Sequence, residues 1–126
     1  MNITTQTPII ATWHTDPGHG WLLVREAWLH QVGLTELDFS PFSYRHFDRI
    51  ERGEAAPGIQ WFALEEDLDA QIFLRAAKQR GITVITQTPM QKNEDHYIRS
   101  WPPINGRSYE DWRLVRDDIV GRYAQH

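Results

Sequence analysis

The order of apolar and polar residues near the start of the chain predicts a β-hairpin. β-Branched and aromatic residues dominate positions 7–13, and an apolar run occupies positions 21–24, as is typical of strands. Asp16-Pro17-Gly18 lies between them. Asp accepts local backbone hydrogen bonds, Pro fixes φ and Gly supplies a positive φ, so this tripeptide predicts a tight turn with Gly18 at positive φ.

A short helix is expected next, over positions 25–32. Val24, Trp28 and Val32 recur at four-residue spacing, and Gly33 stands where helix C-termini favour glycine. Positions 42–62 are then typical of a second hairpin. Aromatic and polar residues alternate over part of its first strand, two glycines and a proline interrupt the pattern, and β-type residues resume at position 59.

The most regular helical pattern lies over positions 64–80. Acidic residues fill its first turns and basic residues its last, which suits the helix macrodipole. An apolar row runs along it, and Gly81 stands where the helix would end. These groups are Glu65, Glu66, Asp67 and Asp69 at the start, Arg75, Lys78 and Arg80 at the end, and Leu64, Leu68, Ile72 and Ala76 in the row. A strand is expected over 82–86, where it could add a parallel pair to the sheet.

An irregular segment, broken by prolines and by an Asn-Gly pair, covers positions 89–106. A final helix is predicted to begin after Ser108, which with Asp111 three residues on forms a variant of the capping box. Its apolar stripe consists of Trp112, Val115 and Ile119.

These elements follow the order β-β-α-β-β-α-β-α and predict a single α+β domain over residues 1–126. The sheet should be mainly antiparallel, built from two hairpins plus one further strand, with three helices on one of its faces. We expect one shared core that contains Leu68, Ile72, Phe73, Val84, Trp112, Val115 and Ile119.

Composition narrows the functional classes. The chain has no cysteine, which excludes disulfides, thiolate zinc sites and cysteine nucleophiles. It has no apolar run long enough to span a bilayer and no signal-peptide pattern, so we expect a cytoplasmic protein without a membrane partner. The net charge is −4 and the basic residues are scattered, which disfavours nucleic acid as a partner.

Two histidines and an aspartate at the predicted hairpin tip have the chemistry of metal ligands. His14, Asp16 and His19 could hold a divalent metal, joined in space by carboxylates from Glu65, Glu66 or Asp69. This arrangement would make the chain a metal-dependent hydrolase. Acidic residues at a helix start also have a purely electrostatic explanation, and Asp before Pro is an ordinary turn residue. The sequence leaves both interpretations open.

Aromatic and cationic residues in two segments favour the recognition of a partner protein. Trp, Tyr and Arg dominate binding energies at protein interfaces. The first group is Trp13, His14, Asp16, His19 and Trp21 around the hairpin tip, and the second is His96, Tyr97, Arg99 and Trp101 in the irregular segment. We therefore expect both groups to contribute to an interface.

Motifs for nucleotide chemistry and for serine hydrolases are missing. No Gly-rich phosphate-binding loop precedes a helix, and neither Ser40 nor Ser43 lies in a G-x-S-x-G sequence. Without a complete catalytic set, the sequence favours a non-enzymatic interaction module that needs no cofactor. The metal-dependent hydrolase is the alternative.

Three segments carry a resemblance to a known group of proteins. W-H-T-D-P-G-H-G-W-L-L-V at 13–24, S-P-F-S-Y at 40–44 and L-E-E-D-L-D-A-Q-I-F-L at 64–74 resemble short, functionally uncharacterised bacterial proteins carried on phages and plasmids. The resemblance covers roughly residues 13–80 and implies no catalytic residues. It implies a mobile-element accessory protein that binds a host protein, for example an anti-CRISPR-like inhibitor of a host defence system.

Overall fold

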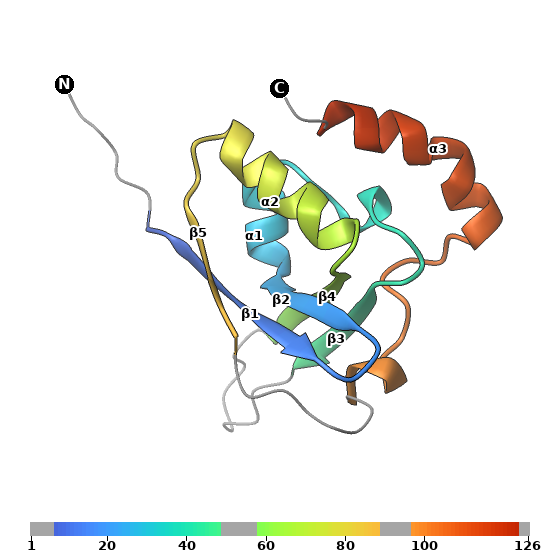
Figure 1. Cartoon of the computed structure of the whole chain (residues 1–126), viewed down its shortest axis with the longest axis horizontal. Helices are drawn as coiled ribbons and strands as arrows, with labels where there is room; N and C mark the ends of the chain where they lie inside the picture. The colour runs from blue at the N-terminus through green and yellow to red at the C-terminus, as the bar shows by residue number, and fades with distance from the viewer. Residues whose placement is uncertain (1–6, 49–57, 89–96, 124–126) are drawn as a thin grey trace.

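The computed structural model describes residues 7–48, 58–88 and 97–123. It contains a five-stranded sheet with the strand order β3-β4-β2-β1-β5 (Figure 1). In chain order the elements are β1 (Ile9–Thr15), β2 (Gly20–Arg25), α1 (Glu26–Gln31), the 3₁₀ helix η1 (Glu36–Asp38), β3 (Tyr44–Asp48), β4 (Ile59–Glu65), α2 (Asp69–Gln79), β5 (Val84–Gln87), the 3₁₀ helix η2 (Tyr97–Ser100) and α3 (Tyr109–Arg122). The predicted α+β class and element order are confirmed.

The sheet is mixed, as the last predicted strand suggested. β1 pairs with β2, β2 with β4 and β4 with β3, all antiparallel. β5 joins the far edge in parallel with β1, with Ile9 opposite Val84. The crossover through α2 makes this parallel pair possible, because parallel neighbours need a long connection.

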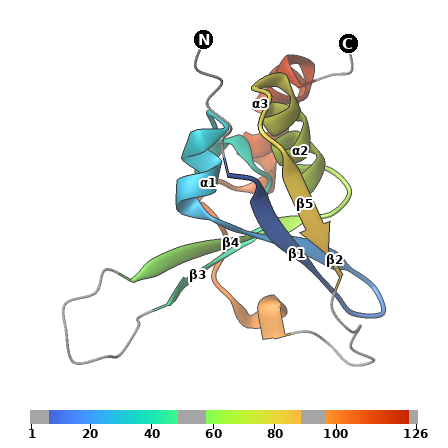
Figure 2. The ribbon, with the colours of Figure 1, turned by 90° about the vertical axis from the view of Figure 1, so that its left-hand side faces the viewer.

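One face of the sheet carries the main core. Strand residues alternate between the two faces, so Leu22 and Val24 of β2 point the same way as Phe62 and Leu64 of β4, all four fully or almost fully buried. α1 and α2 lie on this side of the sheet (Figure 2). Further core residues are Ile9, Ala11, Leu29, Val32, Leu34, Phe39, Ala70, Ile72, Phe73, Ala76, Ala77, Ile82, Ile104 and Ile119.

The second face of the sheet is also covered, in part, by the segment around η2. Figure 2 shows η2, in orange, on the side of the sheet opposite α1 and α2. Ile98 of η2 is fully buried there against Trp21 and Ala63. Leu23, Tyr44 and Trp101 pack around them. The chain therefore has a small second core where the sequence predicted only an irregular segment.

The start of α2 differs from the sequence-based prediction. The helix begins at Asp69, and Leu64 and Glu65 belong to β4. Glu65 lies opposite Trp21 of β2, so the strand pairing continues into the acidic run. Its carboxylate then accepts hydrogen bonds from Asp67 N at 2.7 Å and Leu68 N at 3.1 Å. Pairing with a neighbouring strand has overridden the local helical pattern.

The apolar stripe of α3 was only partly predicted. Ser108 caps the helix as expected, since its hydroxyl accepts from Asp111 N at 3.1 Å. Ile119 joins the main core, whereas Trp112 is buried outside it and Val115 is 36% exposed. Val115 was therefore wrongly placed in the core, and Trp112 is buried but does not share the main core as predicted. Among residues 7–48, 58–88 and 97–123, no helix has both the length and the apolar character needed to cross a membrane.

Candidate functional site

The hairpin tip between β1 and β2 is held by the side chain of Asp16. Its Oδ1 accepts from Gly18 N at 3.2 Å and His19 N at 3.0 Å, and Asp16 N donates to His19 O at 2.9 Å. The predicted turn with aspartate as its local acceptor is confirmed. The predicted positive φ at Gly18 is wrong, because among the described glycines only Gly33 and Gly81 have positive φ. The aspartate carboxylate and the proline are enough to shape this turn.

An ion pair joins the hairpin tip to η2. Arg99 Nε donates to Asp16 Oδ2 at 2.7 Å, and Arg99 Nη2 donates to Asp16 Oδ1 at 3.0 Å. The Asp16 side chain is completely buried, whereas 34% of the Arg99 side chain is exposed. Arg99 Nη2 also lies 2.6 Å from His19 Nδ1. Two segments separated by some 80 residues are thereby fixed to one another with the planar two-bond geometry of strong arginine–carboxylate pairs.

The Trp21 ring packs beside this ion pair. His19 stacks on it with ring centroids 5.8 Å apart, the Arg99 guanidinium lies 5.6 Å from its centroid, and Tyr44 meets it edge-on at 6.2 Å. Trp101 stacks on another ring of β3, His46, at 4.6 Å. These ring contacts hold η2 and its neighbours against the second face of the sheet.

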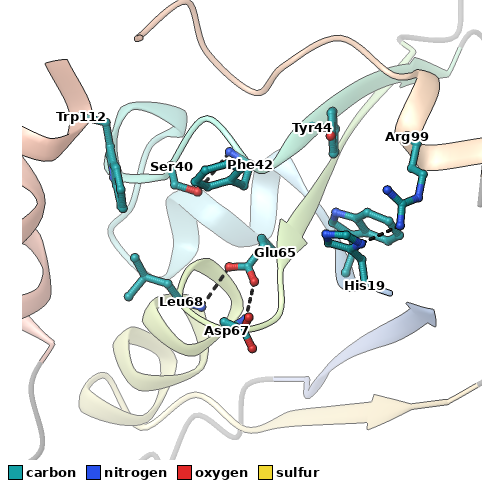
Figure 3. A pocket seen from close by; sticks show the side chains of 10 residues that line it. His19, Ser40, Phe42, Tyr44, Glu65, Asp67, Leu68, Arg99 and Trp112 are labelled. Atoms are coloured by element: carbon teal, nitrogen blue, oxygen red, sulfur yellow. Dashed lines mark hydrogen bonds between the residues drawn. The ribbon is translucent and has the colours of Figure 1, made fainter. Parts of the chain in front are cut away.

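A pocket of about 380 Å³ opens next to Trp21 and Arg99 (Figure 3). Aromatic rings, two carboxylates and the His19–Arg99 pair surround it. The lining residues are His19, Trp21, Ser40, Phe42, Tyr44, Glu65, Asp67, Leu68, Arg99 and Trp112. Its volume is at the lower end of the range of about 300–1,000 Å³ typical of ligand pockets, a size suited to a small group or a single side chain.

Glu65 brings an anionic group to this pocket from the end of β4. Partial burial raises the pKa of its carboxyl above the ordinary value of 4.5, although the two backbone N–H donors from Asp67 and Leu68 lower it. In Figure 3 the Glu65 carboxylate points toward Asp67 and Leu68, and its two hydrogen bonds are drawn to them. The pocket lining therefore includes a partly desolvated carboxyl group, that of Glu65, and an exposed one, that of Asp67.

A second buried carboxyl group positions the loop that carries Phe42. Asp69 accepts hydrogen bonds from Ser40 N, from Ser40 Oγ at 2.6 Å and from Ser43 Oγ at 2.5 Å. Ser43 Oγ in turn accepts from Glu65 N at 2.9 Å. The Asp69 carboxyl is fully buried, and burial raises its pKa while the serine hydrogen bonds lower it. This network holds the loop against the start of α2.

The structure gathers four of the residues predicted to recognise a partner. Asp16, His19, Trp21 and Arg99 form one cluster, although they come from two separate sequence segments. Of the other predicted residues, Trp13 packs against the main core on the opposite face, His14 lies across from Trp21 in the β1–β2 pairing, and Trp101 packs beside Tyr44. His96 lies outside the described residues, as does the side chain of Tyr97.

Six of the ten residues that line the pocket were not predicted as site residues from the sequence, and three of the six are aromatic. Phe42, Tyr44 and Trp112 reach the pocket from the loop before β3, from β3 itself and from α3. An aromatic residue on a strand or helix is ordinarily explained by the core, so nothing local distinguished them. The repeated aromatic residues around Ser40 and Ser43 were the available signal.

The six residues considered as metal ligands do not come together in one site. Asp16 is bonded to Arg99, Asp69 is bonded to the serines, and Glu66 lies beside Gly20 at the start of β2. Within the part of the chain that the structure describes, no three His, Asp or Glu side chains are grouped so as to hold a metal ion. His14, Asp16, His19, Glu65, Glu66 and Asp69 all belong to that part.

Comparison of the chain with protein-family models, curated proteins and solved structures finds no match.

Proposed function

We propose that this chain is a non-enzymatic module that binds a partner protein through the face that contains the pocket. The observation that carries the proposal is the bidentate Asp16–Arg99 pair, which fixes the hairpin tip and η2 beside a ring-lined pocket. A surface whose parts are already ordered loses less entropy when it binds.

Exposed aromatic side chains support the same interpretation. Phe42 is 55% exposed at the pocket, and Tyr109 at the start of α3 meets it at 6.0 Å and is itself exposed. Aromatic residues, phenylalanine among them, are enriched in protein interfaces relative to the rest of the surface. Phe42 and Tyr109 together extend the apolar surface beyond the pocket.

The serine hydroxyl groups of the Phe42 loop support binding in preference to hydrolysis. Ser40 and Ser43 are buried, and both hydroxyls donate to the carboxylate of Asp69. A serine nucleophile needs an adjacent base and access to substrate. The hydrogen bonds of these serines instead support a structural role in the Phe42 loop.

The partner that we propose is a host protein of a cell that carries a phage or plasmid. This step rests on the resemblance of residues 13–80 to functionally uncharacterised mobile-element accessory proteins, and inhibition of a host defence system is one specific form that binding to a host protein would take. The pocket-bearing face would be the surface that contacts the host protein.

A matched pair of phenylalanine variants tests the proposal. Phe42 lines the pocket, whereas Phe47 is 52% exposed on β3 and does not line it. We expect wild type and Phe47→Ala to capture one stoichiometric protein from cells that naturally make this chain, and Phe42→Ala to lose it. Loss of an interface anchor costs about 2 kcal/mol or more, or roughly 30-fold in affinity. Equal capture by both variants, or no stoichiometric partner, would contradict the proposal.

A further inference from the structure

The pocket has an excess of negative charge. Glu65 and Asp67 line it, and the positive charge that it contains is that of Arg99. Arg99, however, already gives two hydrogen bonds to the carboxylate of Asp16 behind the pocket wall. The Asp16–Arg99 pair is neutral as a unit, so Glu65 and Asp67 dominate the electrostatic potential that a ligand meets.

The carboxylate of Glu65 has capacity for further hydrogen bonds. One of its oxygens accepts from Asp67 N and the other from Leu68 N. A carboxylate oxygen has two acceptor positions, so each oxygen retains one for a ligand. Figure 3 shows the two backbone bonds on the α2 side of the carboxylate, with Phe42 above it.

The pocket also provides aromatic surface next to these carboxylates. Phe42 is more than half exposed and Tyr44 lies on the neighbouring strand. Aromatic faces attract cations, and arginine stacks on them better than lysine because guanidinium is more weakly hydrated.

Two arginines of the chain itself lie over tryptophan rings. The guanidinium of Arg25 lies 5.5 Å from the ring centroid of Trp61, and that of Arg116 lies 5.9 Å from the centroid of Trp112.

We propose that the pocket receives an arginine side chain of the partner protein, with the guanidinium against Phe42 and Tyr44 and hydrogen-bonded to Glu65 and Asp67. This inference rests on the proposed function and specifies the chemistry of its partner. A positive charge at this position also offsets the desolvation that raises the pKa of Glu65.

Titration of the full chain with a capped arginine tests the inference. The probe is Nα-acetyl-arginine-N-methylamide, and its citrulline counterpart replaces the guanidinium by a neutral urea of the same shape. NMR spectra should show saturable shifts at Glu65, Tyr44 and Trp112 with the arginine compound. The citrulline compound should bind about ten-fold more weakly, because it lacks charge-assisted hydrogen bonds.

Two neighbouring carboxylates provide the variant and its control. Asp67→Asn removes a lining charge and keeps the backbone N–H groups of residues 67 and 68 that donate to Glu65. Glu66→Gln removes the charge of an adjacent residue that does not line the pocket. We expect Asp67→Asn to weaken arginine binding several-fold and Glu66→Gln to leave it unchanged. Glu65→Gln should have the larger effect, checked against the folded spectrum.

Three results would overturn the inference. They are equal binding of the arginine and citrulline compounds, the absence of a saturable shift at the pocket, and tighter binding of free arginine than of the capped form. If partner capture still depends on Phe42 in any of these cases, the proposed function stands and only the arginine is wrong. If capture fails while the capped arginine binds, the protein-binding function is wrong.

Discussion

At the scale of single residues, Asp69 shows how this fold accommodates a carboxyl group in its interior. The residue is completely buried, yet a backbone N–H and two serine hydroxyls donate to it. Buried polar groups are tolerated when their hydrogen bonds are made. The same bonds position the loop that presents Phe42, so the stability of the domain and the shape of the pocket depend on one side chain.

The raised pKa of Asp69 predicts how its contribution to stability changes with pH. Its carboxyl binds a proton more tightly in the folded chain than at the ordinary value of 3.8. The folded state therefore holds more protons in the window above 3.8, and the free energy of unfolding falls as pH rises through it. Asp69→Asn cannot ionise, so wild type should lose stability relative to this variant by up to about 1.4 kcal/mol per pH unit.

Urea unfolding of both proteins from about pH 4 to about pH 7 measures this difference. The pH trend is informative even if Asp69→Asn is less stable throughout, since the amide replaces one acceptor oxygen. Asp67→Asn serves as the control that removes an exposed carboxyl next to α2. The value to follow is the free energy of unfolding of wild type minus that of Asp69→Asn. If this value stays constant or increases with pH, burial does not dominate the pKa of Asp69.

At the scale of elements, the helix ends follow local rules. Gly33 and Gly81 follow the C-cap residues of α1 and α2 and adopt φ of +83° and +70°. Glycine is favoured there because a Cβ makes the left-handed conformation costly. Both positions were predicted from the sequence alone, since a C-terminal glycine depends on the helix before it and on little else.

Two glycine substitutions should change stability in opposite directions. Gly33→Ala places a Cβ at positive φ and against the guanidinium of Arg80, so we expect a loss of about 1–2 kcal/mol. Gly121 lies inside α3 with open space around it, and Gly121→Ala should stabilise by about 0.5–1 kcal/mol. Thermal and urea unfolding measure both. A loss of stability in Gly121→Ala would mean that α3 does not persist as a helix to its last turn.

The start of α2 illustrates the limit of local rules. Acidic residues, an apolar row and a closing glycine all indicate a helix from position 64, yet Leu64 and Glu65 form strand pairs with β2. Leu64 is fully buried as a residue of β4. Hydrogen bonds to β2, some 40 residues earlier in the chain, favour the strand over the helix at these two positions.

At the scale of the whole molecule, both faces of the sheet are used, but unequally. The main core lies between the sheet and α1 and α2, while the opposite face carries the small cluster of Trp21, Ala63 and Ile98 (Figure 2). The pocket lies where this small cluster, the Phe42 loop and the start of α3 meet. Its walls therefore depend on η2 remaining in place.

Truncations in the two clusters should separate folding from pocket integrity. Ile72→Ala in the main core should cost about 2–5 kcal/mol, as is typical of buried isoleucine. Ile98→Ala should have a cost in the same range and should also disturb the pocket, because η2 carries Arg99. Val115→Ala at the exposed position of α3 should stay within about 0.5 kcal/mol. Urea unfolding, with NMR shifts of Trp21, measures these effects. Undisturbed Trp21 shifts in Ile98→Ala would show that the ion pair and the ring contacts hold η2 without the Ile98 side chain.

The sequence by itself determined the types and order of the strands and α-helices, the turn at Asp16 and the glycines that follow α1 and α2. These features depend on contacts within a few residues, and periodicity or capping chemistry reports them directly. It also indicated the hairpin tip and the segment containing Arg99 as separate candidate surfaces. Only the tertiary structure decided that Asp16 pairs with Arg99, that Asp69 bonds Ser40 and Ser43, and that Phe42, Tyr44 and Trp112 share a pocket. Such contacts form between residues distant in sequence, because the folded sheet brings them together and no local pattern records that geometry.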